Sequence, residues 1–467
     1  MGSGETTIPQ VNPADSARLS LLLTGAIVVS LAGLLGGMQY VIIALALGLT
    51  ILVARKPEEA VPAGLLFMLA AMTLLPARAR LHFLDSQTEG IDWQQYYWAA
   101  GSLIIVLAAF YRVGFASLLR APAPLKAFLL VAIASAIFGF SRGNATSYVF
   151  RQLYGSILFV LYFVIARAAG DEELLFRRLK TFGVLVALAF FVYYASVFSE
   201  WGFHKEDTSL PIQMGMLATL LFVKGLVEKR LSWIAPSGVL FLASFLLFFR
   251  NILLTFCFAV ALALAMGSAS RIRRLVCFGV AGLILLPSIF PFGAQYVLEV
   301  VQKDLPMVYE LLPEGTHDTR TLRDRTIELS TSVAVLLQYP VLGIGMGSDF
   351  GWYRDDVVNP SPEYAFVEKA YVDNGWAYVM VKMGGAGILA FGWVLISMLR
   401  CMSKQSLAIS ISLLAILMIA MFSEPVCFQF TMSPIAGALA GILYARKHPL
   451  PRLYSAAAVG KSNARII

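Results

Sequence analysis

Long apolar stretches separated by short polar segments run along most of the chain. A membrane-spanning helix needs about 20 mostly apolar residues, and roughly 17–25 are tolerated. By that criterion the chain holds about 14 spans, near residues 20–36, 38–54, 61–76, 94–111, 124–140, 153–168, 181–199, 208–226, 233–249, 251–268, 275–293, 374–399, 406–423 and 427–445. Because the breaks at 36–38 and 249–251 are short, about 12 spans also fit. The pattern predicts an all-α, polytopic helical membrane protein.

Composition supports this class and excludes a soluble protein. Hydrophobic residues make up 59% of the 467 residues, charged residues only 14%, and the mean hydropathy is +0.76. Soluble domains have roughly 45–50% apolar and about 25% charged residues. The net charge of +8 lies in short loops between apolar runs, which is typical of membrane topology rather than of nucleic-acid binding.

Basic residues gather in every second loop if the N-terminus is cytoplasmic. Cytoplasmic loops of membrane proteins carry an excess of Lys and Arg. With this orientation every predicted inner loop is basic and the C-terminus also lies inside. These residues are Arg55, Lys56, Arg112, Arg120, Lys126, Arg177, Arg178, Lys180, Lys229, Arg230, Arg271, Arg273, Arg274, Arg400, Lys404, Arg446 and Lys447.

We expect one membrane domain with a large outer cap. The predicted organisation is a cytoplasmic tail at 1–18, transmembrane helices 1–11 at 19–293, a periplasmic cap loop at 294–373, transmembrane helices 12–14 at 374–445 and a cytoplasmic tail at 446–467. Within the cap, the amphipathic segment 325–339 predicts a short helix that ends at Pro340. Three glycines at 343, 345 and 347 predict a tight turn against the membrane surface.

Arginines on the predicted outer side are the first candidates for ligand binding. The planar guanidinium binds two phosphate oxygens at once and stays charged. They therefore indicate an anionic lipid head group, such as a pyrophosphate. The alternative for each is snorkelling or ion pairing with cap carboxylates; Arg250, with almost no loop around it, favours phosphate. The set is Arg78, Arg80, Arg142, Arg151, Arg250, Arg320, Arg323, Arg325 and Arg354.

Asp373 is the candidate general base, because it ends the polar cap just before an apolar helix. A carboxylate beside apolar surface can take up a proton more readily than usual. The alternative is that Asp373 caps the helix that begins near Asn374. The four histidines have no metal-ligand or nucleophile partner at a telling spacing, so we expect no metal and no cofactor.

Two stretches together resemble a known enzyme family. Arg325, a helix of fixed length, and then Tyr339-Pro340-Val-Leu-Gly343-Ile-Gly345-Met-Gly347 form the first. Asp373-Asn374-x-Trp376, followed by Lys382-Met-Gly384-x-x-Gly387, forms the second. Both are similar, in this order, to motifs of the O-antigen ligase and Wzy polymerase superfamily of the bacterial inner membrane. Arg250 also lies where that family carries an arginine. The family has histidine at positions 373 and 339, and these departures favour a polymerase over a ligase.

The resemblance implies a polysaccharide polymerase acting on an undecaprenyl-pyrophosphate-linked donor glycan at the periplasmic face. An acceptor sugar hydroxyl would attack the anomeric carbon, with Asp373 orienting or deprotonating it. Arg250 and Arg325 would stabilise the departing pyrophosphate, and the remaining candidate contacts with the substrate are Arg142, Arg151, Arg78, Arg80, Arg323, Asn374 and Tyr339. Expected partners are the donor, an acceptor glycan, the lipid bilayer and a chain-length regulator protein.

Two alternatives remain open from sequence. One is a ligase that attaches the finished glycan to lipid A-core or to a protein. The other is a transporter or flippase for lipid-linked glycans, which should place charged residues within its spans, often at broken helices. Nearly all ionisable residues lie at span ends, and Arg167, Lys224 and Lys382 are the ones that decide between the classes.

Overall fold

The structure is a computed structural model that describes residues 38–74, 93–191, 209–246, 250–267, 270–289, 320–353, 366–369, 372, 374–402, 406–421, 425–429 and 431–448. The first predicted span, near 20–36, and most of the cap therefore lie outside the described residues. So do the tail proposed at 1–18 and all but the first three residues of the tail proposed at 446–467.

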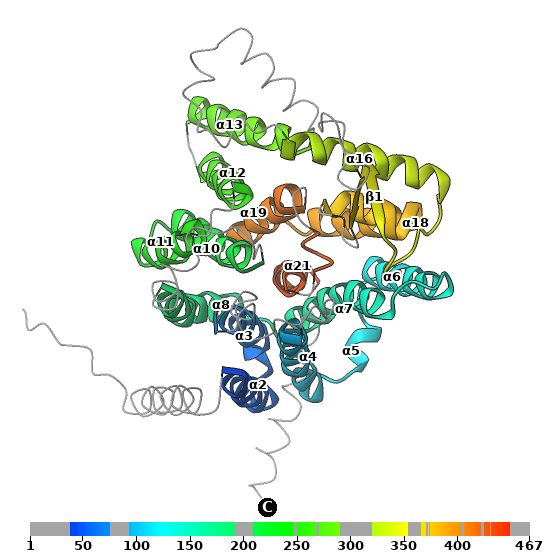
Figure 1. The fold of residues 1–467 in the computed structure, drawn as a ribbon. Coiled ribbons are helices and arrows are strands. Elements are labelled where there is room, and N and C mark those ends of the chain that lie inside the picture. The colour runs from blue at the N-terminus through cyan, green and yellow to red at the C-terminus, as the bar shows by residue number, and fades with distance from the viewer. Residues whose placement is uncertain are drawn as a thin grey trace, which may run out of the picture.

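Helices occupy each predicted apolar segment that the structure describes (Figure 1). The longer helices are α2 (Met38–Arg55), α3 (Ala60–Leu74), α4 (Trp93–Val113), α6 (Ala123–Ser141), α7 (Thr146–Ala169), α10 (Ser209–Glu228), α11 (Leu231–Leu246), α12 (Arg250–Gly267), α13 (Arg271–Ile289), α16 (Arg320–Gln338), α18 (Gly375–Leu399), α19 (Leu407–Ala415) and α21 (Ser433–Lys447). Shorter elements are η1 (Pro57–Glu59), α5 (Ala116–Leu119), α8 (Glu172–Arg178) and the π-helical turns η3 (Leu179–Gly183) and η6 (Ile416–Ala420).

The all-α membrane fold is confirmed. Among the described residues, three helices are both long and apolar enough to cross a bilayer, namely α6, α7 and α18. The cap contains a feature that the sequence did not predict, an antiparallel pair of short strands, β1 (Phe350–Tyr353) and β2 (Phe366–Lys369). The aromatic and β-branched residues of these segments suit a pleated strand.

Helix α21 lies at the centre of the bundle, packed along α7 (Figure 1). Gly437 and Gly441 stand four residues apart and so share one face of α21. A Cβ at Gly437 would lie 2.3 Å from the Phe159 carbonyl oxygen, and one at Gly441 would lie 2.3 Å from that of Phe163. Small residues at this spacing let two membrane helices approach closely, which explains the buried core between α7 and α21.

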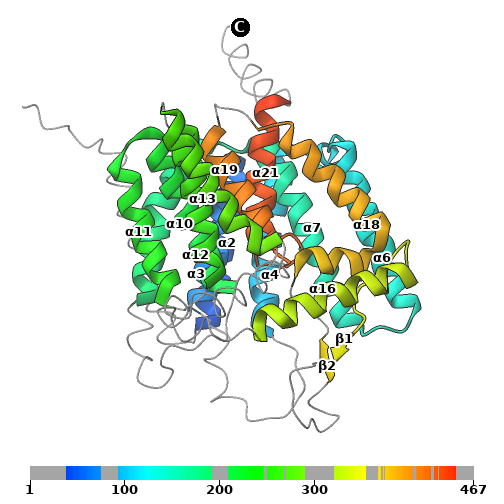
Figure 2. The ribbon, with the colours of Figure 1, turned by 90° about the horizontal axis from the view of Figure 1, so that it is seen from above.

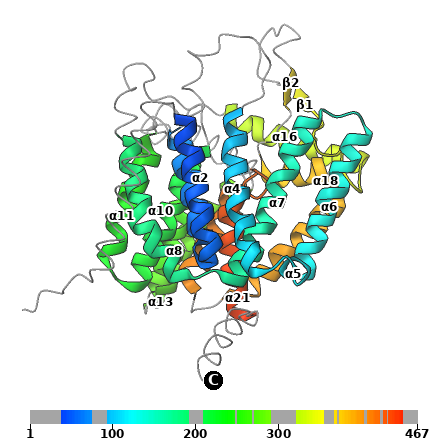
Figure 3. The same ribbon diagram turned by 90° about the horizontal axis from the view of Figure 1, so that it is seen from below.

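The two ends of the bundle differ. The strand end, where β1 and β2 lie, is opposite the Arg446 end, where α21 ends (Figure 3). At the Arg446 end, Arg167 Nη1 donates to the Arg120 carbonyl at 2.8 Å, and Lys447 Nζ donates to the Arg400 carbonyl at 2.6 Å. Three of the predicted inner loops and the end of α21 therefore meet at one end, as their shared basic character indicated.

Candidate active site

The predicted site residues differ in how far the structure places them. Asp373, Arg78 and Arg80 lie outside the described residues. Arg250 is the first residue of α12, whereas Arg323 and Arg325 lie in the first turns of α16. For these three the structure describes only the position along the helix. The residues described with their side chains are Arg142, Arg151, Tyr339 and Asn374.

Helix α18 begins with Asn374 as its N-cap. The residue has extended backbone angles, and its Oδ1 accepts hydrogen bonds from the N–H groups of Trp376 at 2.8 Å and Ala377 at 3.1 Å. Asn satisfies the free N–H groups of a first turn about as well as Asp. The alternative role of Asp373 as the helix cap is therefore wrong by one residue, because Asn374 already fills it.

Glu328 of α16 contacts this helix start. Its side chain is nearly fully buried, with 1% of the residue exposed. Its Oε1 accepts the N–H of Asn374 at 3.4 Å, and this N–H belongs to the peptide bond that follows Asp373. A buried carboxylate is costly unless it is hydrogen-bonded or paired. The contact joins α16 to α18 directly beside the predicted base.

Arg325 lies three residues before Glu328 on α16, so the two positions share one face of that helix. Figure 2 shows α16 lying across the strand end, with the first segment of α18 alongside it. The structure thus brings the arginine-bearing face of α16 to the start of α18, where Asp373 joins it. The N-terminus of a helix also favours anions, because its free N–H groups carry partial positive charge.

Arg142 and Tyr339 form a second cluster. The guanidinium of Arg142, at the end of α6, lies 5.1 Å from the centre of the Tyr339 ring, and both residues are exposed. Tyr339 directly follows α16. It is 11 residues beyond Glu328, which corresponds to roughly 16 Å along the helix. Two predicted substrate residues are therefore brought together, but apart from the cluster at Glu328; Arg151 lies in α7, half-buried.

The glycine turn after α16 runs between helices. Gly343, Gly345 and Gly347 have φ values of 65°, 85° and 77°, where glycine avoids the steric cost of a Cβ. A Cβ on Gly343 would lie 2.1 Å from the Val381 carbonyl oxygen of α18, and one on Gly345 2.9 Å from the Gly139 nitrogen of α6. The predicted tight turn is present, and its three glycines are buried between helices.

The turn packs where α18 is broken. Gly384 has φ 61° and ψ −157°, which interrupts the helix, and Figure 2 shows the two segments of α18 meeting at an angle. Just after the break, the Gly385 N–H donates to the Pro340 carbonyl at 2.8 Å and the Ala386 N–H donates to the Val341 carbonyl at 3.1 Å. The turn therefore accepts hydrogen bonds from the second segment of α18.

The first segment of α18 is satisfied in the same way. A continuous helix would direct the carbonyls of Val381 and Lys382 toward the N–H groups four residues on. Here the Val381 carbonyl accepts the Ile344 N–H at 2.8 Å, and the Lys382 carbonyl accepts the Ser135 hydroxyl of α6. An irregular backbone at membrane depth is tolerated only when protein groups replace its lost hydrogen bonds, and the glycine turn and α6 do so.

Lys382 ties the far end of the turn to α18. Its side chain is fully buried, and Nζ donates to the Ser348 carbonyl and, at 3.3 Å, to the Ser348 hydroxyl. Asp349 supplies a favourable charge nearby. Lys382 therefore departs from the expectation that ionisable residues lie at the ends of spans. Lys224 and Arg167 agree with it, since each stands near the end of its helix.

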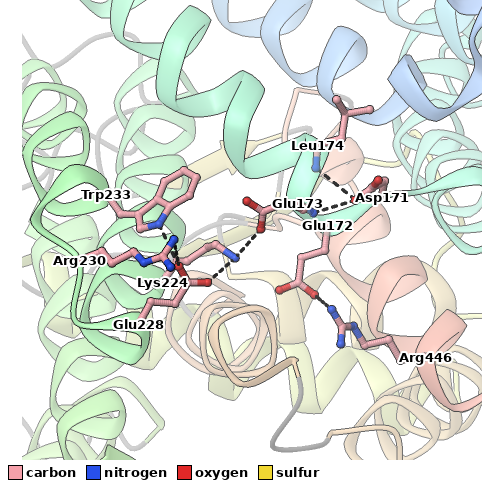
Figure 4. Close-up of polar contacts among 9 residues, drawn as sticks. All are labelled: Asp171, Glu172, Glu173, Leu174, Lys224, Glu228, Arg230, Trp233 and Arg446. Carbon is pink, nitrogen blue, oxygen red and sulfur yellow. Dashed lines mark hydrogen bonds and ion pairs between the residues drawn. The ribbon is translucent and has the colours of Figure 1, made fainter. Parts of the chain in front are cut away.

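A second polar network lies away from this site, at the Arg446 end (Figure 4). Lys224 of α10, whose side chain is 7% exposed, pairs with Glu228 at 2.8 Å and with Glu173 of α8 at 3.2 Å. Glu228 also accepts the indole N–H of Trp233 at 3.0 Å. Asp171 caps α8 through its hydrogen bonds to backbone N–H groups. These contacts join α8, α10 and α11.

Two further ion pairs strengthen the same end. Arg446 forms an ion pair with Glu172. Arg178 donates two hydrogen bonds to the Glu59 carboxylate, one from Nε and one from Nη2. Burial raises the pKa of the Glu172 carboxyl, although Arg446 offsets part of this effect. Hydrogen bonding to the Glu59 carboxylate raises the pKa of the Arg178 guanidinium. These ion pairs hold together the loops at this end.

Comparison with known proteins supports this resemblance. The family model described as O-Antigen ligase matches residues 216–392. Over this segment the chain is similar to the superfamily of O-antigen ligases and Wzy polymerases. No curated protein and no solved structure matches it. The match supports a membrane enzyme of the kind that ligates or polymerises lipid-linked glycans.

The O-antigen ligase match extends from within α10 to within α18. It contains Arg250, Arg325, Glu328 and the start of α18, whereas Arg142 lies before it. The matched segment thus includes the contact between α16 and α18. Within the described ranges, no group of three or more His, Cys, Asp or Glu side chains is arranged to hold a metal ion.

Sequence reasoning missed the contact of Glu328 with the start of α18 and the break at Gly384. The sequence gives little indication of the Glu328 contact, because Glu328 is one of several acidic residues in the predicted cap. The break had some signal in the run Gly384-Gly385-Ala386-Gly387, since glycines are costly inside a helix.

Proposed function

We propose that the protein is a polysaccharide polymerase that extends an O-antigen or exopolysaccharide chain. It transfers a glycan from undecaprenyl pyrophosphate to a sugar hydroxyl of an acceptor glycan. The observation that carries this proposal is the Glu328–Asn374 contact. Through it, the face of α16 that includes Arg325 adjoins the peptide that follows Asp373.

The proposed reaction is a single displacement at the anomeric carbon of the donor. The acceptor oxygen forms the new glycosidic bond as the bond from that carbon to the pyrophosphate breaks. The hydroxyl proton passes to the Asp373 carboxylate, and undecaprenyl pyrophosphate leaves with the bonding electron pair. Arg250 and Arg325 stabilise its growing charge, an electrostatic role typically worth several kcal/mol. Arginines can carry this charge without a metal, so we propose a metal-independent enzyme.

Asp373 and Tyr339 favour polymerase over ligase, because the superfamily motif has histidine at both positions. The ligase alternative makes a different prediction about the product: the glycan would appear on lipid A-core or on a protein. The two are separated by the acceptor that a purified enzyme uses, and a chain-length regulator protein is a further expected partner only for the polymerase.

We place the site at the periplasmic face of a bacterial inner membrane, with both termini in the cytoplasm. The support is the basic character of the loops that meet at the Arg446 end, which the positive-inside rule assigns to the cytoplasm. The strand end, with α16 and the start of α18, then faces the periplasm.

Transport of lipid-linked glycans is the second candidate, and one observation favours it. Lys382 is a fully buried cation within α18, two residues before the helix break. Broken helices with buried charge are typical of transport sites. Here the break is filled by the glycine turn and the charge is held by Ser348, which favours a structural role over a substrate path.

The test of the proposed base is Asp373→Asn. Asn374 already caps α18, so this change leaves the cap intact and removes only the proton acceptor. We expect polymer formation to fall by about 10²–10⁴-fold, the usual contribution of a general base. The measurement is polymer length on gels from cells that express each variant equally.

Asp171→Asn is the matched control, because Asp171 caps α8 at the other end of the bundle. Asn replaces Asp well at a cap, so polymer length should not change. Chains of near-normal length from Asp373→Asn would remove Asp373 from the mechanism.

A further inference from the structure

Glu328 is a buried acid that the proposed reaction does not yet use. It lies on α16, and its residue is 1% exposed. Burying a carboxylate away from water costs free energy, and hydrogen bonds or nearby opposite charges must offset this cost. Its Oε1 accepts a hydrogen bond from the Asn374 N–H at 3.4 Å.

The backbone around Glu328 is also fixed. Its carbonyl accepts the hydroxyl of Ser332, one turn further along α16, at 2.6 Å, and Ser332 is fully buried. At the other partner, Asn374 turns its own side chain inward to cap α18. Both ends of the Glu328–Asn374 link therefore belong to well-packed helices, and the peptide between residues 373 and 374 is held from two sides.

We propose that Glu328 is a positioning residue, which holds the peptide N–H between Asp373 and Asn374 and so fixes where the base stands. This proposal rests on the proposed function. A catalytic group must be held closely, since a misplacement of about 1 Å can cost a hundredfold in rate. Asp373 is bonded directly to the peptide that Glu328 binds, so a shift of that peptide moves the base.

A positioning role and a catalytic role for Glu328 give opposite results with Glu328→Gln. The Gln side-chain oxygen can still accept the Asn374 N–H, but it cannot take up a proton. If Glu328 positions the peptide, Glu328→Gln should keep most of the activity. Glu328→Ala, which has no acceptor, should lower kcat by about tenfold to a hundredfold with little change in KM.

Two measurements on purified protein in nanodiscs test the proposal. The first is the rate of glycan transfer from a lipid-linked donor. The second is hydrogen exchange of the peptide that spans the start of α18. Glu328→Ala should make the Asn374 amide exchange about fivefold faster, as expected for one modest hydrogen bond. Glu328→Gln should exchange like the wild type.

Ser330→Ala is the matched control, because it removes a hydroxyl that bonds a carbonyl of the same helix, that of Ile327, from an exposed position. It should change neither measurement. Loss of activity in Glu328→Gln with normal exchange would overturn the proposal and make Glu328 itself the proton acceptor. Unchanged exchange and activity in Glu328→Ala would also overturn it. If the wild type transferred no glycan while Glu328→Ala still exchanged faster, the proposed function would fail and the link between the helices would stand.

Discussion

Gly384→Ala should destabilise the protein strongly, because the break in α18 admits no side chain. A Cβ at this position would lie 2.4 Å from the Gly343 nitrogen and 2.6 Å from the Val341 carbonyl oxygen. Both atoms are backbone, so no flexible side chain can move out of the way. The backbone angles, φ 61° and ψ −157°, are also unfavourable for any residue with a Cβ.

The magnitude follows from these two effects. Holding alanine in a sparsely populated conformation costs roughly 1–3 kcal/mol. Moving the turn away weakens the bonds from Gly385 to Pro340 and from Ala386 to Val341, each worth about 1 kcal/mol net. The free energy of unfolding should therefore fall by roughly 3–5 kcal/mol.

The assay is thermal unfolding of the detergent-solubilised protein, followed by the loss of the monodisperse peak in size-exclusion chromatography. We expect the midpoint of Gly384→Ala to fall by roughly 5–10 °C. Gly392→Ala is the matched control: it makes the same chemical change in the same helix, and a Cβ there meets nothing within 4 Å. It should be neutral or slightly stabilising, because alanine favours helix by up to about 1 kcal/mol.

A midpoint for Gly384→Ala equal to that of the wild type and of Gly392→Ala would refute this reasoning. It would mean that α18 can run straight without the contact to the glycine turn. The start of α18, and with it the site, would then be positioned by other contacts.

The remaining predictions concern the Arg446 end and the membrane topology. Lys224→Met should lower the free energy of unfolding by roughly 1–3 kcal/mol, measured by the same thermal assay, because it removes the cation between Glu228 and Glu173. Glu228 retains the more distant Arg230, at 4.0 Å. The partial exposure of these acids keeps the cost below that of a fully buried pair. Polymer formation per folded molecule should be unchanged, and a variant as stable as the wild type would show that the network contributes nothing. A reporter enzyme that is active only in the periplasm should be active when it is fused near Glu314. Activity there from a reporter that works only in the cytoplasm would contradict the predicted topology.

Much of the fold follows from hydropathy alone, because lipid requires long apolar helices and loop charge sets their direction. The meeting of Arg120, Arg167 and Arg400 with the end of α21 shows that the predicted loops share an end of the bundle. The break at Gly384 was not predictable in this way. A hydropathy profile shows residues 374–399 as one apolar run. It carries no information about whether another segment of the chain replaces the hydrogen bonds that a break removes.

The candidate site residues stay a prediction. The structure places α16 against α18, so the two elements that carry the two halves of the motif pattern are neighbours. The N-cap of α18 was predicted one residue too early, at Asp373 instead of Asn374. Asp and Asn cap helices equally well, and the two residues are adjacent. Tyr339 stays a predicted substrate contact, and it lies roughly 16 Å along the helix from Glu328.

The most direct test of glycan transfer uses purified protein in liposomes that contain an undecaprenyl-pyrophosphate-linked repeat unit. Chain length and released undecaprenyl pyrophosphate are measured together for the wild type, Arg250→Ala and Arg250→Lys. We expect the wild type to release one undecaprenyl pyrophosphate for each unit added, Arg250→Ala to insert but form no polymer, and Arg250→Lys to recover little, because lysine lacks the bidentate fork. Movement of the donor across the bilayer without chain growth, or full polymer formation by Arg250→Ala, would contradict the account.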